Sequence, residues 1–160
     1  MNKRKKEKEL RRRYGKLADS MEAYYHHLDF RPFNDLDDDG FAFLLQNVKG
    51  VDLLDLDETE IGNQSIHLLS HLQYLKELRL KGCRNLDNGC CSFLNKLTTL
   101  ELLHVKGTAV TIDGLLQLTN LSRLTTLLFS ADDPDAIQEK IAGLHELLPD
   151  CKLILNGTPL

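Results

Sequence analysis

The sequence predicts an α/β solenoid, with a short parallel β-sheet on the concave face, helices on the convex face and a helical cap at each end. Three observations predict this fold class. A six-residue pattern with apolar residues at its first, fourth and sixth positions occurs five times at nearly constant spacing. Helix-like apolar stretches separate the copies, and amphipathic helical patterns flank the array. The 160 residues are enough for one domain with a continuous core.

The repeated pattern is clearest at 75–80, 100–105 and 124–129, with an earlier copy at 51–56 and a degenerate last copy at 150–155. The fourth-position residues lie 24, 25, 24 and 26 residues apart, and they are Leu54, Leu78, Leu103, Leu127 and Leu153. This spacing is that of a leucine-rich repeat, whose period is about 20–29 residues. Each copy predicts a short strand whose alternate side chains point inward. We therefore expect repeat strands near 51–57, 75–81, 100–106, 124–130 and 151–156.

Helical stretches are expected between the strands. Their apolar residues follow helical spacing, as in Ile66, Leu69 and Leu72, and then Phe93, Leu94 and Leu97. Short polar residues before a glycine are expected to cap these helices, namely Asp39, Asn88 and Asp113. An incomplete first repeat is expected to have its strand near 28–30. No single repeat can bury its own apolar face, so the repeats must stack.

A small polar residue follows each strand at the same distance. These residues are Thr59, Cys83, Thr108, Asp132 and Thr158. We expect such side chains to satisfy backbone groups where the chain turns out of the strand.

Both ends of the array carry capping patterns. One stripe of a long N-terminal helix is formed by Leu10, Tyr14, Leu17, Met21, Tyr24 and Leu28. At the other end, Pro134 begins a helix that Pro149 stops, and its apolar face is formed by Ile137, Ile141, Leu144 and Leu148. A last edge strand is expected at 153–155, with Pro159 discouraging further pairing. The expected organisation is a basic segment and capping helix over 1–30 and a repeat domain over 31–160.

The basic head contrasts with an acidic body. Residues 3–16 contain nine Lys or Arg and two Glu, a local charge of +7, so the rest of the chain carries −11 to reach the net −4. The head could contact a nucleic acid or an anionic membrane through Lys3–Lys16. The chain contains no apolar run near the roughly 18 residues of a membrane span. The sparse cysteines favour reduced thiols and an intracellular location.

Some residues resemble a known repeat subclass. Gly82–Cys90 with Leu94, Leu97 and Leu100, the segment Gly107–Leu115 and the ending Leu147–Lys152 resemble the cysteine-containing leucine-rich repeats. More narrowly, Cys83–Cys90, the Leu-Pro-Asp-Cys ending and Arg13-Tyr14-Gly15 resemble the mitochondrial ATP synthase subunit s (coupling factor B) and complex I membrane-arm assembly family. The resemblance implies a binding or assembly factor. The cytoplasm is one expected compartment, and the narrower resemblance implies the mitochondrial matrix. Glu7 and Glu9 differ from the acidic-poor composition of a transit peptide.

Three motifs could carry chemistry, and each has a structural interpretation that we prefer. The segment Asp35–Gly40 nearly matches a calcium loop, but Gln46 stands where a bidentate Glu is required, so helix capping is favoured. His67 and His71 have a zinc-pair spacing without the catalytic Glu. Cys83–Cys91 could form a thiol or metal site, although the C-x6-C-C spacing is not that of zinc, and core packing is favoured. We expect no catalytic residues, metal or cofactor.

The concave sheet is the expected site. Its central and C-terminal side chains combine cations with aliphatic groups, and they are Arg79, Lys81, Leu102, His104, Lys106, Leu128 and Ile154. Leu102, Leu128 and Ile154 are expected to form an exposed contiguous patch, which is typical of partner sites. We therefore predict a non-catalytic interaction module or assembly adaptor. Its expected partner is another protein with an acidic patch, with no small-molecule substrate. The alternatives are a tether through the basic head and a thiol or metal site at Cys83–Cys91.

Overall fold

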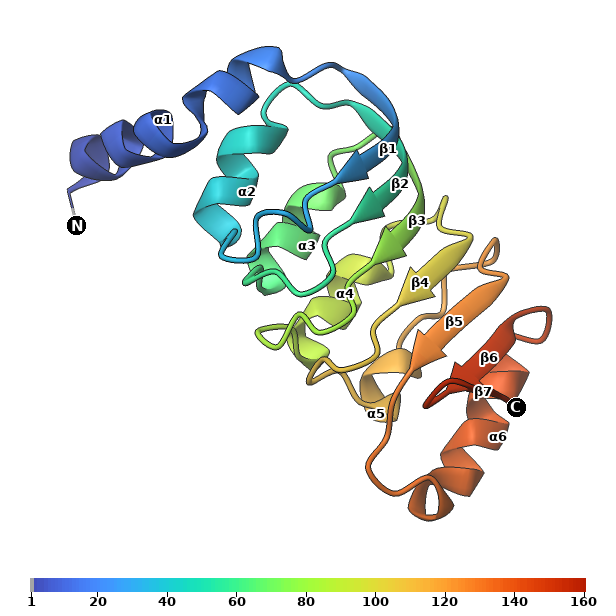
Figure 1. Cartoon of the computed structure of the whole chain (residues 1–160). Helices are drawn as coiled ribbons and strands as arrows, with labels where there is room; N and C mark the ends of the chain where they lie inside the picture. Colours follow the sequence, from blue (N-terminus) through green and yellow to red (C-terminus); the bar gives the residue numbers. More distant parts are fainter. Residues whose placement is uncertain (1) are drawn as a thin grey trace.

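Six parallel strands lie side by side in chain order, and helices run along one face of the sheet (Figure 1). The computed structural model describes residues 2–160. The strands are β1 (Tyr24–Asp29), β2 (Gly50–Asp55), β3 (Tyr74–Arg79), β4 (Leu102–His104), β5 (Thr126–Phe129) and β6 (Lys152–Leu155). The α-helices are α1 (Lys3–Ser20), α2 (Asp38–Leu45), α3 (Asn63–Leu69), α4 (Cys91–Leu94), α5 (Ile112–Leu115) and α6 (Gln138–Leu147), and short 3-10 turns precede α4 (η1, Asn88–Cys90) and α6 (η2, Asp135–Ile137). The chain is therefore an α/β protein with a mostly parallel sheet, as predicted.

The register of the sheet follows the leucine period. The fourth-position leucines lie directly opposite one another from β2 to β6, pairing Leu54 with Leu78, Leu78 with Leu103, Leu103 with Leu127 and Leu127 with Leu153. Their side chains are at most 1% exposed. Leu28 of β1 extends this buried row by pairing with Leu54. The predicted common core of the five leucines is confirmed.

The small polar residue after a strand performs the expected turn chemistry in three copies. Thr59 and Thr108 each donate a hydroxyl hydrogen bond of 2.7 Å to the carbonyl three residues earlier, at Leu56 and Val105. The thiol of Cys83 instead donates to the Leu56 carbonyl of the preceding repeat, at 3.0 Å. Each such bond satisfies a backbone oxygen where the strand ends.

The helix caps lie at different residues from those predicted. Asp37, and not Asp39, caps α2, because its extended backbone lets the carboxylate accept from the Gly40 N–H at 2.9 Å. Asp87, and not Asn88, has the same role before η1, and Thr111 rather than Asp113 precedes α5. In each case the glycine lies inside the helical turn, so the cap falls earlier than expected.

Polar contacts between repeats add to the stacking of the core. The Asp38 carboxylate of α2 accepts from the backbone N–H groups of Gly62 and Ser65, at 2.8 and 3.1 Å, and from the Ser65 hydroxyl. It therefore satisfies free N–H groups at the start of α3 in the next repeat. The Asn88 amide similarly bonds Thr111 one repeat later.

The predicted N-terminal helix is wrong over its last part. Helix α1 ends at Ser20, and Met21 is extended (ψ 135°). Tyr24 and Leu28, which continue the helical stripe in the sequence, lie in β1 instead. Pairing with β2 gives β1 hydrogen bonds along one edge and buries Leu28, and this tertiary pairing outweighs the local helical periodicity. The strand expected near 28–30 therefore begins earlier.

The C-terminal cap helix is present, but the last edge strand is not the end of the sheet. Ile141, Leu144 and Leu148 are buried along α6. A short strand, β7 (Thr158–Pro159), pairs antiparallel with β6, so the expectation that Pro159 discourages pairing is wrong. Asn156 and Gly157 have φ values of 51° and 83°, which are typical of a tight hairpin turn.

Candidate protein-binding surface

The face of the sheet that the helices leave uncovered, called here the open sheet face, carries the predicted residues in rows across the strands. One row consists of Asp29, Asp55, Arg79, His104, Leu128 and Ile154, each opposite the next. A neighbouring row consists of Leu53, Glu77, Leu102, Thr126 and Lys152. Lys81 and Lys106 follow the ends of β3 and β4. The structure thus places four of the seven predicted residues in one row.

The N-terminal end of this row is acidic, and Arg31 partly neutralises it. Asp55 is only 5% exposed, and its carboxylate lies 3.3 Å from Nε of Arg31. Arg31 also binds Asp29 at 2.8 Å, and this hydrogen bond holds the pKa of Asp29 below its usual value. Burial, followed by the charge of Asp55, raises the pKa of Asp57. Arg31 is therefore occupied by the acidic pair.

The centre of the row is cationic and incompletely paired. Arg79 makes only a long contact of 3.4 Å to Glu77, and among residues 2–160 Lys81 and Lys106 have no ion-pair partner. Partial burial lowers the pKa of His104, and the nearby charges of Arg79, Lys81 and Lys106 lower it further. Neutral imidazole is therefore favoured beside a cluster of fixed positive charges.

The predicted apolar patch is less exposed than expected. Leu102, Leu128 and Ile154 are half-buried, because neighbouring strands shield part of each side chain. Leu128 and Ile154 are direct neighbours, whereas Leu102 lies opposite Glu77 and Thr126 in the adjacent row. The aliphatic surface is thus a pair of side chains at the C-terminal side with a third residue one row away.

A hollow on the N-terminal side of the sheet was missed by the sequence analysis. It has a volume of about 320 Å³ and is lined by His26, His27, Asp52, Leu53, Lys76, Glu77 and Glu101. Asp52 binds His26 at 2.8 Å and Lys76 at 3.2 Å, and the hydrogen bond from His26 is the main cause of its lowered pKa. The repeat period would have found this cluster, since Asp52, Lys76 and Glu101 share the second position of the repeat.

The cysteines lie in the core. Cys83, Cys90, Cys91 and Cys151 are free and buried. Burial raises the pKa of Cys83 and of Cys151 to about 11. A buried, protonated thiol is a poor nucleophile and metal ligand. Cys83 and Cys151 therefore fit turn formation and packing. The hydrogen bond between the neighbouring thiols raises the pKa of Cys90 and lowers that of Cys91.

The candidate metal motifs do not converge. His67 and His71 are exposed, with ring centroids 6.2 Å apart, and His67 packs against Phe93. The carboxylates of the calcium-like loop have separate partners, because Asp35 pairs with Arg13, Asp37 caps α2 and Asp39 pairs with Lys6 at 2.6 Å. Within residues 2–160, no three His, Cys, Asp or Glu side chains are grouped as a metal site requires.

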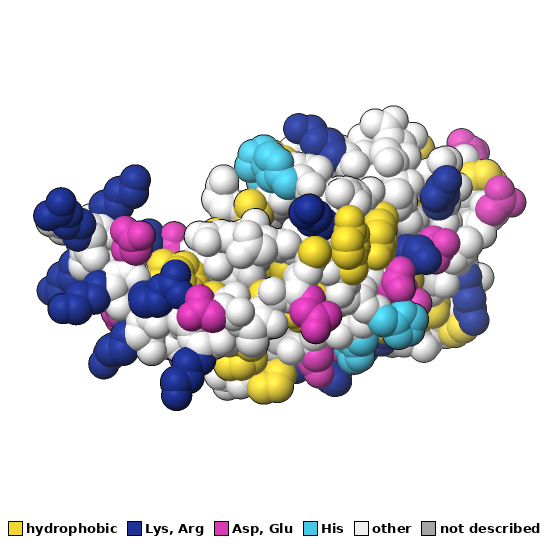
Figure 2. Space-filling view, turned by 90° about the horizontal axis from the view of Figure 1, so that it is seen from above, with side chains coloured by type: hydrophobic (Ala, Val, Ile, Leu, Met, Phe, Trp, Pro, Cys, Tyr) yellow, Lys and Arg dark blue, Asp and Glu magenta, His cyan; other side chains and the backbone are white. Residues whose placement is uncertain are grey.

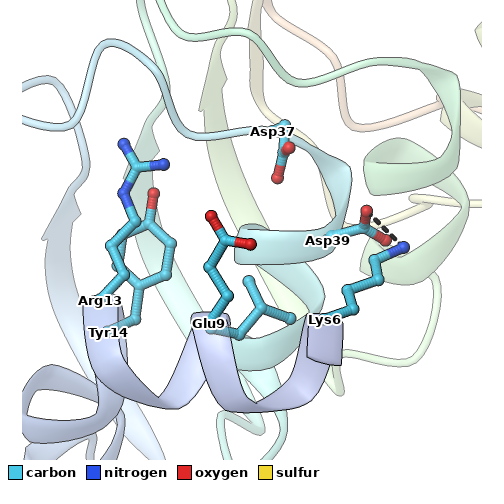
Figure 3. Close-up of a pocket in the computed structure, with 7 residues that line it drawn as sticks. Lys6, Glu9, Arg13, Tyr14, Asp37 and Asp39 are labelled. Atoms are coloured by element: carbon cyan, nitrogen blue, oxygen red, sulfur yellow. Dashed lines mark ion pairs between the residues drawn. The ribbon is translucent and has the colours of Figure 1, made fainter. Parts of the chain in front are cut away.

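A small hollow lies between α1 and α2. Its volume is about 120 Å³, and its lining includes Glu9, Arg13, Tyr14 and the Lys6–Asp39 ion pair (Figure 3). Tyr14 is 4% exposed, and its hydroxyl has no hydrogen-bond partner among the described residues. Tyr14 packs edge-on against Phe33 at a centroid distance of 6.3 Å. The hollow therefore marks where α1 is seated on the first repeat.

Comparison with known proteins adds no assignment. A scan against protein-family models finds no match, and a search of the curated proteins finds no relative. Among residues 2–160, no helix combines the length and the apolar character needed to cross a membrane.

Proposed function

We propose that the chain is a leucine-rich-repeat solenoid of the cysteine-containing subclass that binds another protein on its open sheet face and acts as a non-catalytic adaptor. The observation that carries this proposal is the row across β3–β6, where the guanidinium of Arg79 and the imidazole of His104 adjoin the aliphatic Leu128 and Ile154. The resemblance to the ATP synthase subunit s and complex I assembly family suggests an assembly partner in the mitochondrial matrix. A cytoplasmic partner is the other form of the proposal.

The repeat assignment is supported by three features of the fold. The strands recur at the leucine period, and each pair of strands from β2 to β6 keeps the fourth-position leucines opposite each other. The turn residues Thr59 and Thr108 bond the carbonyl three residues earlier, and Cys83 bonds the Leu56 carbonyl of the preceding repeat. In such an array the inward side chains form the core, and the open sheet face stays available for partners.

The division of the open sheet face suggests how binding would work. Positive charge near the centre favours encounter with an acidic protein and mainly accelerates association. The half-buried Leu128 and Ile154 supply apolar contact area, whose contribution depends little on salt. A surface of this kind suits a partner that presents acidic and aliphatic residues together.

The test begins with partners captured on the immobilised chain from a lysate of the source cells. Binding kinetics of a purified partner are then measured at low and high ionic strength. Leu128→Asp should weaken binding at both ionic strengths. The double variant Arg79→Glu with Lys106→Glu should slow association mainly at low ionic strength. Ala142→Asp, at an exposed position on α6, is the matched control. Unchanged affinity in both test variants would refute the proposal.

A second candidate function is an electrostatic tether through α1. Lys and Arg side chains are gathered on this helix, at the left in Figure 2. Three of them are ion-paired, namely Lys6, Arg11 and Arg13. Among the described residues the other six have no ion-pair partner, and they are Lys3, Arg4, Lys5, Lys8, Arg12 and Lys16. The buried face of α1 includes Tyr14, and the exposed face is polar and mostly cationic, with Glu7, Glu9 and Asp19 as its acidic residues.

The tether is tested by charge reversal rather than deletion, because removing α1 would also expose the core around Tyr14. The unmodified chain should bind double-stranded DNA or phosphatidylserine vesicles with an affinity that falls strongly as salt is added. The triple variant Lys5→Glu, Lys8→Glu and Arg12→Glu should lose this binding. Equal, salt-insensitive binding by both proteins would reject this candidate. Loss of the captured partner in this variant, but not in Leu128→Asp, would favour the tether over the adaptor.

A further inference from the structure

Two buried nitrogens at the centre of the open sheet face have no hydrogen-bond partner. They are Nε of Arg79 and Nε2 of His104, whose residues lie directly opposite each other on β3 and β4. Among residues 2–160 the only other buried side-chain nitrogen or oxygen atom without a partner is the hydroxyl of Tyr14. Buried polar groups are normally satisfied. Nε of Arg79 can only donate a hydrogen bond, and Nε2 of His104 donates when the imidazole is protonated, so one acceptor placed here would satisfy both nitrogens.

The charges around this pair specify an anion. Arg79, Lys81 and Lys106 are the cations that face His104, and Asp55 is the acidic group that opposes them. Asp55 is already bound by Arg31 at 3.3 Å, and Glu77 makes only a long 3.4 Å contact with Arg79. Strand β5 contributes no titratable group here, since its residues on this face are Thr126 and Leu128, and Ser130 follows its end. Asp57 also lies near Arg79 and Lys81, but its carboxylate accepts from the Lys81 backbone N–H at 2.8 Å. Among residues 2–160, the ammonium groups of Lys81 and Lys106 therefore still have no ion-pair partner beside the two unpaired nitrogens.

The neighbouring side chains specify what carries the anion. Leu128 is opposite His104, and Ile154 is opposite Leu128, so an aliphatic surface continues directly from the cationic pair. An inorganic anion would use only the cations. A carboxylate beside an aliphatic side chain would use both parts of the row, which favours an Asp or Glu within an apolar stretch of a protein.

We propose that Arg79 and His104 bind the carboxylate of an acidic side chain of a protein partner, that Leu128 and Ile154 contact the adjoining aliphatic residue, and that His104 takes up a proton from solvent as the carboxylate docks. This inference rests on the proposed adaptor function, because it names the chemistry of the partner at the same face. The side chains of Arg79 and His104 are only half-buried, so rotation about their side-chain torsions can present Nε and Nε2 to the partner.

Proton uptake follows from the electrostatics of the site. In the free protein, partial burial and three cations favour neutral His104. A docked carboxylate adds a negative charge and a hydrogen-bond acceptor, both of which favour imidazolium. Affinity should therefore increase as the pH falls from about 7.5 to about 5.5, by at most about tenfold per pH unit for one linked proton. Below about pH 4.5 the partner's own carboxylate becomes protonated and the attraction is lost.

The test follows the imidazole resonances of His104 by NMR during pH titration of the full chain at constant ionic strength. The probe is N-acetyl-Leu-Glu-Leu amide, added until the titration no longer changes or to its solubility limit. N-acetyl-Leu-Gln-Leu amide is the matched control, because it differs only in lacking the charge. The Glu peptide should raise the titration midpoint of His104 by about half a pH unit or more, and the Gln peptide should not. Arg79→Gln should remove the effect while His104 still titrates.

An unchanged midpoint with the Glu peptide would overturn the carboxylate site, as would an equal shift with the Gln peptide or a shift that persists in Arg79→Gln. These outcomes are separable from failure of the adaptor function. If Leu128→Asp still weakens a captured partner, the face binds protein by another chemistry and only the carboxylate site is wrong. If the midpoint shifts but no captured partner responds to Leu128→Asp, the carboxylate site stands and the adaptor function is wrong.

Discussion

Replacing Leu103 by alanine tests the stacked core at its centre. Leu103 is fully buried, and it lies between Leu78 on β3 and Leu127 on β5, which are also fully buried. Neighbouring backbone on both sides is held in the sheet, so the strands cannot readily collapse into the space that the substitution opens. The variant should therefore retain the fold while losing stability.

The expected loss can be worked from the burial of the side chain. Alanine lacks three of leucine's carbon groups, each worth about 0.8 kcal/mol when buried, which gives a transfer cost of about 2.4 kcal/mol. A cavity that stays open adds to this cost, and measured losses for buried leucines extend to about 5 kcal/mol. We expect the free energy of unfolding to fall by about 2–5 kcal/mol.

Urea denaturation of the purified variant measures the change in the free energy of unfolding. Thermal unfolding should show a fall in Tm of about 2–4 °C per kcal/mol for a chain of this size. Leu102→Ala is the matched control, because Leu102 lies on the same strand but is half-buried, and it should cost less than about 1 kcal/mol. A loss below about 1 kcal/mol for Leu103→Ala, or equal losses for the two variants, would refute the stacked-core reasoning.

Three further predictions concern the polar residues and the thiols. Asp38→Ala should lower the free energy of unfolding by about 1–2 kcal/mol, because its carboxylate bonds N–H groups of the next repeat. Asp39→Ala, which loses one exposed ion pair, should change it by less than about 0.5 kcal/mol in the same urea titration, and equal effects would count against the capping role. Millimolar calcium should not raise Tm, and a rise that Asp37→Ala abolishes would reverse the capping assignment. Iodoacetamide should label Cys83 and Cys151 slowly in the folded chain at pH 8, since their thiols ionise only near pH 11, and rapid native labelling would contradict this.

The core and the order of the strands could be predicted because they depend on a period. Once Leu54, Leu78 and Leu103 are aligned, stacking is the only arrangement that buries all the repeats, and the sheet register follows from it. The same alignment placed Arg79, His104 and Leu128 on one face. The hollow lined by His26, Asp52 and Lys76 was not predicted, although Asp52 and Lys76 share the second position of the repeat, because His26 lies in the part of β1 that the sequence predicted as helix.

Features outside the period were decided by tertiary contacts. Tyr24 and Leu28 continue the helical spacing of α1, so the sequence around them is compatible with a longer helix. As β1, these residues instead pair with β2, and a longer helix would leave that edge of β2 without backbone partners. The turn at Asn156-Gly157 and the pairing of Pro159 with β6 were not predicted, because the pairing depends on the fold around this end of the sheet.

The sequence by itself determined the period, the inward residues and the charge of each face, because these are properties of residue order. Only the tertiary structure decided which charges neutralise one another. Arg31 reaches Asp55 from a loop outside the repeat pattern, and this contact occupies the carboxylate of the residue opposite Arg79 on β2. Arg79 and His104 therefore have unpaired nitrogens because of side-chain distances across the strands, which the order of residues along the chain does not specify.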